Sequence, residues 1–220
     1  MSLDTPEAIA AFIRANTKVL PPPLVPEISL HLAEESLPIW QKTEEELGEM
    51  NVPPPCWAFA WAGGQALARY LLDNRELVAG KRIWDVGSGS GLSAIAAGLA
   101  GGADVAAFDI DRLSLVAMAL NAEINGVSVR ASSEDVLDRA DVDVDVLLVG
   151  DLFYERTVAE RVLGLVDRTS RSGALVLIGD PQRGYFPKGR FECVAEYQVP
   201  VTRELEDAEI KRSSVWRVRR

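Results

Sequence analysis

The chain has 220 residues, which is enough for one substantial hydrophobic core. Hydrophobic residues make up 48% and charged residues 25% of the sequence, and these proportions exclude a disordered chain, a collagen and a coiled-coil rod. The 33 acidic and 23 basic residues give a net charge of −10, so the average surface repels nucleic-acid phosphates and anionic lipids. We therefore expect neither nucleic acid nor a membrane as a partner, whereas a basic patch on another protein would suit this surface.

Cysteine and histidine usage limits the available chemistry. The two cysteines, Cys56 and Cys193, form no CxxC pair, which argues against a disulfide scaffold and a thiolate zinc site. The one histidine, His31, is expected at the surface or in a cap, and without a GxSxG motif an ordinary Ser-His-Asp hydrolase is excluded. No metal site is expected. The sequence lacks both a run of roughly 18 apolar residues and a basic signal peptide, so we expect a cytoplasmic protein.

The first quarter of the sequence is predicted to be an appendage. Helices are predicted over residues 5–16 and 37–47, because the first has a threonine cap with proline behind it and the second ends before a glycine. Proline-rich connectors follow both helices. We therefore divide the chain into a helical N-terminal extension, residues 1–55, and a main domain, residues 56–220.

The main domain alternates between short apolar segments and segments with helical periodicity, which indicates βαβ units. Strands are predicted over residues 82–86, 104–108, 127–131, 145–150 and 174–179, and helices over 65–73, 92–101, 112–125 and 155–171. Two last strands, 191–201 and 213–219, have no crossover helix between them and should form an antiparallel pair. The prediction is an α/β fold with a Rossmann-like, doubly wound seven-stranded sheet, mostly parallel, with an antiparallel C-terminal edge pair.

The strongest functional signal is the glycine-rich run from Asp85 to Gly91 (DVGSGSG), which follows a predicted strand and opens a predicted helix. Glycines permit a tight turn and close approach of a ligand, and the helix start offers unpaired N–H groups. Asp109 follows the next strand, 18 residues beyond Gly91, where a carboxylate can accept hydrogen bonds from two ribose hydroxyls. Together these features predict a cofactor of the adenosine type.

Two classes of cofactor share this arrangement. A dinucleotide fingerprint, GxGxxG/A, would need glycine or alanine where this chain has Leu92. Asp85, two residues before the first glycine, would repel a pyrophosphate but could accept a hydrogen bond from a cationic ammonium group. S-adenosylmethionine has such a group and no phosphate, so it is favoured over NAD.

The order of these motifs resembles the seven-β-strand, class I methyltransferases. The resemblance rests on the run after the first strand, Asp109 after the second, Glu134 and Asp135 after the third, and the segment Gly150–Tyr154 after the fourth. In that family the glycine loop holds the methionine part, the second acid binds ribose and the third contacts the adenine amine. The resemblance implies S-adenosylmethionine as cofactor, bound by Trp61, Asp85, Gly87, Ser88, Gly89, Gly91, Asp109, Ile110, Glu134, Asp135 and Asp151.

A narrower resemblance rests on Asp151-Leu152-Phe153-Tyr154, on the block from Trp57 to Tyr70, and on Gly179-Asp180-Pro181. These segments are similar to the electron-transfer flavoprotein β-subunit lysine methyltransferases, which implies a protein-lysine N-methyltransferase and that β-subunit as substrate and partner. A ribosomal protein or a small-molecule amine is the alternative acceptor. The second alternative is a cofactor-binding module without catalytic activity. We expect a monomer.

The resemblance also implies roles in methyl transfer. Asp151 would accept a hydrogen bond from the substrate amine and orient it, and Tyr154 would act beside it as the second catalytic residue. Trp57, Phe153 and Tyr154 would line the channel for the lysine and contact methylated products through cation–π interactions. Alternatively, Phe153 and Tyr154 only close the sheet edge, and Trp57 and Trp61, four residues apart, are core residues. Arg183, Tyr185 and Lys188 either touch substrate or belong to a polar loop.

Overall fold

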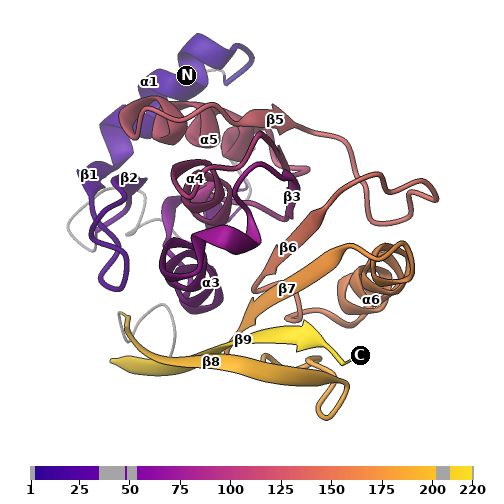
Figure 1. The fold of residues 1–220 in the computed structure, drawn as a ribbon. Coiled ribbons are helices and arrows are strands. Elements are labelled where there is room, and N and C mark those ends of the chain that lie inside the picture. Colours follow the sequence, from indigo (N-terminus) through magenta and orange to yellow (C-terminus); the bar gives the residue numbers. More distant parts are fainter. Residues whose placement is uncertain (1–2, 35–47, 49–53, 202–208, 220) are drawn as a thin grey trace.

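A seven-stranded sheet organises the main body of the molecule (Figure 1). The structure, a computed structural model, describes residues 3–34, 48, 54–201 and 209–219. The sheet has the order β5-β4-β3-β6-β7-β9-β8. Its strands are β3 (Arg82–Val86), β4 (Asp104–Phe108), β5 (Arg130–Ser132), β6 (Val146–Gly150), β7 (Leu175–Asp180), β8 (Phe191–Pro200) and β9 (Ile210–Val218).

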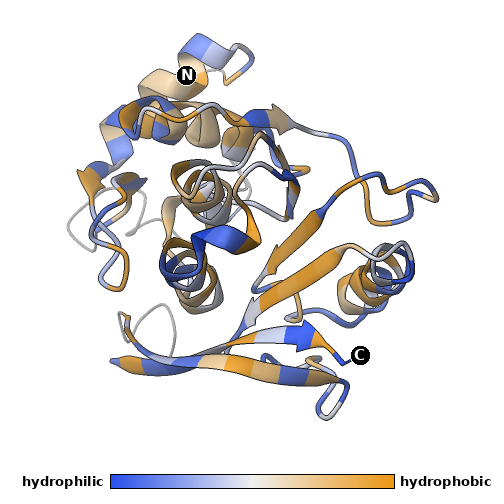
Figure 2. Cartoon of the chain, in the orientation of Figure 1, coloured by the Kyte–Doolittle hydropathy of each residue, from blue (hydrophilic) through white to orange (hydrophobic). Residues whose placement is uncertain are grey.

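The direction of the strands confirms the predicted fold class. The neighbouring pairs from β5 to β7 are all parallel, whereas β9 is antiparallel to both β7 and β8. The central strands are buried on both sides, and Figure 2 shows β6 and β7 as largely apolar ribbons. Continuous apolar strands of this kind are typical of parallel sheets that are covered by helices on both faces.

Helices cover the two faces of the sheet unequally. The apolar residues of α3 (Ala62–Asp73), α4 (Leu92–Leu99) and α5 (Arg112–Ile124) share one core cluster with the sheet. A second cluster packs α6 (Arg156–Arg171) against the opposite face, where Figure 1 shows it alone. Short 3₁₀ turns, η1 (Cys56–Ala58) and η2 (Arg75–Leu77), flank α3. In the described part of the chain, no helix combines the length and the apolar character needed to cross a membrane.

Most predicted elements lie within a few residues of the observed ones, but β5 is shorter than expected. The predicted strand 127–131 begins only at Arg130. The Val127 N–H donates to the Ala122 carbonyl at 3.1 Å and its side chain packs beside Gly98, so this residue closes the turn after α5 and is not part of a strand. The apolar pattern could not distinguish this helix end from the start of a strand.

The extension contains a β-hairpin that the sequence did not predict. After α1 (Pro6–Asn16), β1 (Lys18–Leu20) pairs with the antiparallel β2 (Leu30–Leu32) across the segment expected to be only a connector. Two strands of three residues leave no readable alternation, which explains the failure of the pattern. The predicted helix 37–47 lies outside the described residues, and the division at residue 55 stays a prediction.

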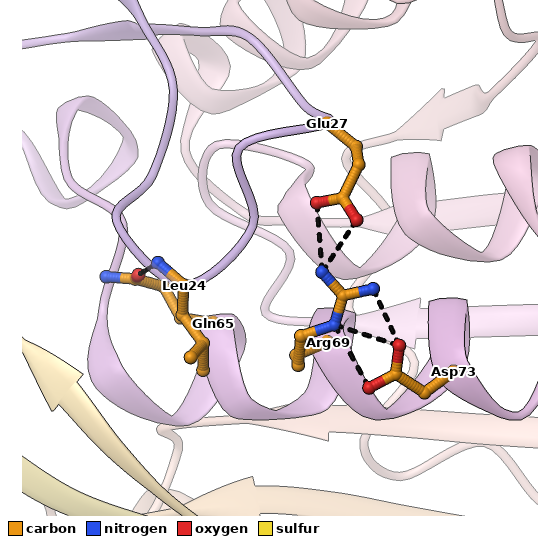
Figure 3. A network of polar contacts seen from close by, with 5 residues as sticks. All are labelled: Leu24, Glu27, Gln65, Arg69 and Asp73. Carbon is orange, nitrogen blue, oxygen red and sulfur yellow. Dashed lines mark hydrogen bonds and ion pairs between the residues drawn. The ribbon is translucent and has the colours of Figure 1, made fainter.

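The hairpin docks on the main domain through polar side chains of α3. Arg69 donates to both carboxylate oxygens of Glu27, at 2.8 and 2.9 Å, and also pairs with Asp73 on its own helix (Figure 3). The Leu24 N–H donates to Gln65 Oε1 at 3.1 Å in the same network. These contacts fix the proline-rich loop of the hairpin against one side of α3.

A second set of contacts joins the hairpin to α5. The buried Asn121 side chain accepts a hydrogen bond from the His31 N–H and donates one to the Ser90 carbonyl, both at 2.8 Å. His31 is buried rather than exposed as expected, with its Nδ1 3.0 Å from Thr17 Oγ1. Burial lowers the pKa of His31, and the nearby charge of Arg14 adds to this shift. Asn121 thus connects the extension, α5 and the glycine-rich loop.

Asn121→Ala is expected to lower the free energy of unfolding by about 2–4 kcal/mol, because it removes two buried hydrogen bonds and leaves their backbone partners unsatisfied. Urea unfolding followed by circular dichroism measures this change. Glu123→Ala, at an exposed position on the same helix, is the control and should change stability by less than about 0.5 kcal/mol. Equal effects of the two substitutions would contradict the connecting role of Asn121.

Candidate active site

The candidate site is built from loops that follow the carboxyl ends of neighbouring strands. The glycine-rich loop follows β3, Asp109 follows β4, Asp151 follows β6, and Asp180 ends β7. Because β3, β4, β6 and β7 are parallel neighbours, these ends meet at one edge of the sheet. In the described part of the chain, no three acidic, histidine or cysteine side chains are grouped so that they could hold a metal ion.

The glycine-rich loop is tightly folded against β4 and the loop after β6. The N–H groups of Gly87 and Ser88 both donate to the Phe108 carbonyl, at 2.9 and 3.1 Å. Gly87 has a φ of 65°, and a β-carbon there would lie 2.5 Å from the Leu152 side chain. Gly91, with a φ of 85°, is the N-cap of α4. Gly87 must be glycine because its backbone has a positive φ and because Leu152 leaves no space for a β-carbon.

Asp85 lies beneath this loop and is almost completely buried. Its Oδ2 accepts hydrogen bonds from the Ser88 hydroxyl at 2.5 Å and from the Ala94 N–H at 3.2 Å. Burial raises the pKa of Asp85 to about 7, although these two donors oppose the shift. A cation bound above the loop would favour the ionised carboxylate. The position of Asp85 therefore fits a ligand with a positively charged group.

Asp109 and Ile110 form the second part of the site. Asp109 Oδ2 accepts a hydrogen bond from the Gly89 N–H at 2.8 Å, and its Oδ1 accepts one from the Asp111 N–H at 2.9 Å. Burial raises the pKa of Asp109. Ile110 beside it is 75% exposed, which is unusual for a large aliphatic side chain and offers a surface for the flat face of an aromatic ring. Carboxylate and exposed apolar surface together fit a ribose with an attached base.

The glycine loop is open at Gly89. A β-carbon at Gly89 would find only the Cys56 carbonyl within 4 Å, at 3.9 Å. Glu134 and Asp135, expected near the adenine amine, are both half-exposed and form ion pairs with Arg139 and Arg161 at 3.1 and 2.9 Å. The donors, acceptors and free space around the glycine loop match an adenosine-type cofactor.

Asp151 is held in a strained and crowded corner. Its φ of 57° lies in the left-handed region, which residues with a β-carbon rarely adopt. Its Oδ2 accepts the Gly64 N–H at 2.8 Å, and its Oδ1 accepts Nε and Nη2 of Arg183 at 2.9 and 2.6 Å. The structure thus fixes both carboxylate oxygens, one from α3 and the other from the loop after β7.

Asp180 is a second carboxylate in the same corner. It is fully buried, and its Oδ1 accepts the Arg183 N–H at 2.7 Å. Its Oδ2 has no hydrogen-bond partner among the described residues. Burial and the neighbouring charge of Asp151 raise the pKa of Asp180 to about 7. Arg183 therefore contacts both carboxylates: its backbone N–H binds Asp180 and its side chain binds Asp151.

The four aromatic residues expected at the site have very different positions. Tyr154 is 60% exposed and lines a cavity of about 340 Å³ together with Lys211 and residues 181–184. The Trp61 indole donates to the Cys56 carbonyl at 2.9 Å, and the Arg183 guanidinium lies 5.5 Å from the centre of its ring. Trp61 and Tyr154 therefore both lie near Arg183, the residue that pairs with Asp151.

Trp57 and Phe153 are instead core residues, both with 0% of their surface exposed. Trp57 packs in the cluster formed by α1, α5 and η1, and Phe153 packs edge-on against Phe186 with 5.3 Å between ring centres. Neither ring reaches the cavity, which corrects the expectation that they line a substrate channel. The alternative interpretation of Trp57 as a core residue and of Phe153 as a plug of the sheet edge describes their positions.

Sequence reasoning missed Asp180 as a site residue and left Arg183 open. Their signal was present in Gly179-Asp180-Pro181, an acid at the carboxyl end of a predicted strand, followed by a basic residue three positions after the acid. The pattern alone gives no indication that the arginine turns back toward Asp151, 32 residues earlier in the chain.

Comparison with known proteins places the chain in a family. It is 37% identical over 223 residues to an electron transfer flavoprotein beta subunit lysine methyltransferase of Danio rerio, covering 98% of this chain and 85% of that protein. The chain belongs to the electron transfer flavoprotein beta subunit lysine methyltransferase family. Its members are named as methyltransferases, which confirms the predicted reaction class.

More distant relatives match only part of the chain. The family model of ribosomal protein L11 methyltransferase (PrmA) matches residues 65–150. A ribosomal protein L11 methyltransferase of Bacillus pumilus is 34% identical over 47% of this chain and 30% of its own. A magnesium protoporphyrin IX methyltransferase of Synechocystis, solved with bound SAM, has a TM-score of 0.52 at 15% identity, covering 71% of this chain and 78% of its own. That likeness confirms the Rossmann-like fold.

Asp109→Ala is expected to weaken the binding of S-adenosylmethionine roughly 10- to 100-fold, because hydrogen bonds to a charged group contribute about 1.5–3 kcal/mol. Isothermal titration calorimetry measures the affinity, and circular dichroism checks that the fold is retained. Asp104→Ala, at the opposite end of the same strand, is the matched control and should leave the affinity unchanged. An unchanged affinity in Asp109→Ala would remove this residue from the cofactor site.

Asp85 should make the protein less stable as the pH rises. Its folded pKa of about 7 lies above the ordinary value of 3.8, so the folded state retains a proton that the unfolded chain has lost. Between these values the free energy of unfolding should fall by about 1 kcal/mol per pH unit because of this group. Asp85→Asn should remove that part of the slope in urea unfolding at pH 4.5–6.5, whereas Asp141→Asn, on an exposed loop, should not. Identical slopes in all three proteins would contradict the assignment.

Proposed function

We propose that this protein transfers a methyl group from S-adenosylmethionine to a lysine of the electron transfer flavoprotein beta subunit. The observation that carries the choice of substrate is the extent of the similarity. Six relatives that carry this name, or are named as its homolog, match 89–98% of this chain, including the extension and the last strands. The ribosomal methyltransferases match about half of it.

The part of the chain that matches the ribosomal methyltransferases and the parts that do not lie in different regions of the structure. Residues 65–150, which match the ribosomal methyltransferase family, run from within α3 to the end of β6 and therefore contain the glycine loop and Asp109. Tyr154 and the loop after β7 lie outside this range and line the cavity, and Asp151, also outside it, pairs with Arg183 of that loop. The segments that face the acceptor are thus those shared with the lysine methyltransferases, which supports a flavoprotein subunit over a ribosomal protein.

The glycine loop supports S-adenosylmethionine as the methyl donor. The turn is open at Gly89, Asp85 would favour a nearby cation, and Asp109 can accept hydrogen bonds from ribose. Ile110 would contact the adenine and Trp61 the methionine side of the cofactor, while Glu134 and Asp135 lie at the end of β5. The proposal assigns no role to a metal.

When bound, this cofactor supplies a methyl group on a positively charged sulfur. The bond from sulfur to the methyl carbon breaks while the lysine nitrogen forms the new N–C bond, and the sulfur is left as a neutral thioether. The nitrogen needs its lone pair for this displacement, but a free lysine with a pKa near 10.4 is almost entirely protonated at neutral pH. Asp151 accepts a hydrogen bond from the amine and aims its lone pair. Tyr154 contacts the side chain at the rim of the cavity, and the released proton passes to solvent there.

The proposal includes a monomeric enzyme that works in the cytoplasm. Both cysteines, Cys56 and Cys193, are free thiols in the structure, which is compatible with a reducing compartment. The excess of acidic residues suits a protein substrate that presents its lysine within a basic surface.

The proposal is tested by incubating the purified protein with tritiated S-adenosylmethionine and isolated electron transfer flavoprotein, with ribosomal protein L11 and free lysine as competing acceptors. Label in a lysine of the beta subunit, located by mass spectrometry, is the expected result. Asp151→Asn should lower turnover by at least about 100-fold with little change in cofactor affinity, since an amide replaces one acceptor oxygen by an NH2 donor and no longer fixes the orientation of the amine. Asp141→Asn is the control.

The other outcomes distinguish the alternatives. Label only in the ribosomal protein or in the small amine would contradict the substrate and keep the reaction. Cofactor binding without transfer to any acceptor would favour a binding module, and undiminished turnover of Asp151→Asn would contradict the role of Asp151.

A further inference from the structure

The Arg183 side chain lies at the point where the proposed acceptor lysine would meet Asp151. Its Nη2 and Nε donate to Asp151 Oδ1 at 2.6 and 2.9 Å, and its guanidinium lies 5.5 Å from the centre of the Trp61 ring. Both side chains of the ion pair are mostly buried, with 17% of Arg183 and 11% of Asp151 exposed. A pair this well shielded is screened far less than a surface ion pair.

The backbone on both sides of this pair is strained. Among the described residues, Asp151 and Gln182 are the two non-glycine residues with positive φ, at 57° and 63°. The strained turn at Gln182 aims the Arg183 N–H at Asp180 Oδ1, 2.7 Å away, while its side chain extends to Asp151. Strained conformations persist only where the surrounding structure determines them, and they concentrate at functional sites.

The ion pair solves an electrostatic problem that the reaction creates. A lone carboxylate beside the substrate would stabilise the lysine as an ammonium ion, which has no lone pair for methyl transfer. Asp180, buried in the same corner, would add to this effect whenever it is ionised. The guanidinium stays protonated at any working pH and brings one positive charge to the two carboxylates.

We propose that Arg183 is a positioning residue that neutralises and orients the Asp151 carboxylate, so that the substrate lysine is held there as a neutral amine. This inference rests on the proposed lysine methyltransferase function. One oxygen of Asp151 is fixed by the guanidinium and the other by the Gly64 N–H, so the carboxylate cannot rotate to follow the ammonium charge. The ammonium proton passes to water in the cavity before the nitrogen attacks, and Arg183 itself neither gains nor loses a proton.

Other charged and titratable groups also face this corner. Tyr154 and Lys211 line the cavity, and Asp180 lies behind Arg183. Burial, Cys56, Glu155 and Asp109 raise the pKa of Tyr154, so its hydroxyl stays neutral in the working range. The packed face of α3 contributes Gly63 and Gly64, which carry no charge. Arg183 is therefore the cation that contacts Asp151 directly from the described loop after β7.

The first experiment needs no substrate. In ¹³C-labelled protein, the Asp180 carboxyl resonance, identified by its loss in Asp180→Asn, is titrated in wild type, Arg183→Gln, Arg183→Lys and Arg190→Gln. The titration midpoint should rise in Arg183→Gln, because the positive charge that favours the ionised form is removed, and should return toward wild type in Arg183→Lys. Arg190→Gln, at the far end of the same loop and paired with Asp167, should leave it unchanged. No shift in Arg183→Gln would overturn the proposed charge effect.

The second experiment measures kcat for lysine methylation between pH 6 and 10 in the same proteins. For Arg183→Gln the rise of kcat with pH should move up by about one unit, which gives roughly tenfold lower kcat at pH 7 and convergence with wild type near pH 10. Arg183→Lys should retain most of the wild-type profile, and KM for S-adenosylmethionine should stay within about twofold throughout. A merely structural role would lower kcat equally at every pH.

The results distinguish a failure of the role of Arg183 from a failure of the proposed function. A wild-type enzyme that methylates lysine, with no displaced profile in Arg183→Gln, overturns the role of Arg183 and leaves the proposed function standing. A wild-type protein that methylates no lysine at any pH overturns the proposed function and this inference with it. A displaced profile that Arg183→Lys restores supports both.

Discussion

The close packing of α3 against the carboxyl ends of β6 and β7 is the constraint on which the site depends. A β-carbon at Gly63 would lie 2.2 Å from the Gly179 carbonyl oxygen, and one at Gly179 would lie 2.1 Å from the Gly63 carbonyl oxygen. Only glycine at both positions lets the helix approach the sheet this closely. The approach brings the Gly64 N–H to Asp151 and places Trp61, the N-cap of α3, beneath the Arg183 guanidinium.

The architecture could be predicted from the sequence because its signals are local and mutually consistent. Short apolar strands alternate with helical periodicity, and the glycine run sits at a strand end, so a parallel sheet with a ligand loop at its carboxyl edge follows directly. The same reasoning located Asp109 and Asp151, since an acid directly after a buried strand lies at that edge.

Side-chain direction and long-range pairing were beyond the reach of the sequence. Trp57, Phe153 and His31 are all buried by segments distant in the chain: α1 and α5 cover Trp57, Phe186 covers Phe153, and Thr17 meets His31. The turn at Gln182 directs Arg183 back to Asp151, and no spacing rule connects two residues on separate loops in this way. The sequence pattern of one chain thus does not determine which loops contact each other.

The single amide of Asn121 holds both the extension, through the His31 N–H, and the glycine loop, through the Ser90 carbonyl. Each contact is made by one end of the same side chain, so a shift of either segment displaces the other. A redesigned extension would therefore have to keep a backbone N–H at this point, or the Asn121 amide would lose one of its two partners. One side chain thus couples the mechanical stiffness of two segments that lie far apart in the chain.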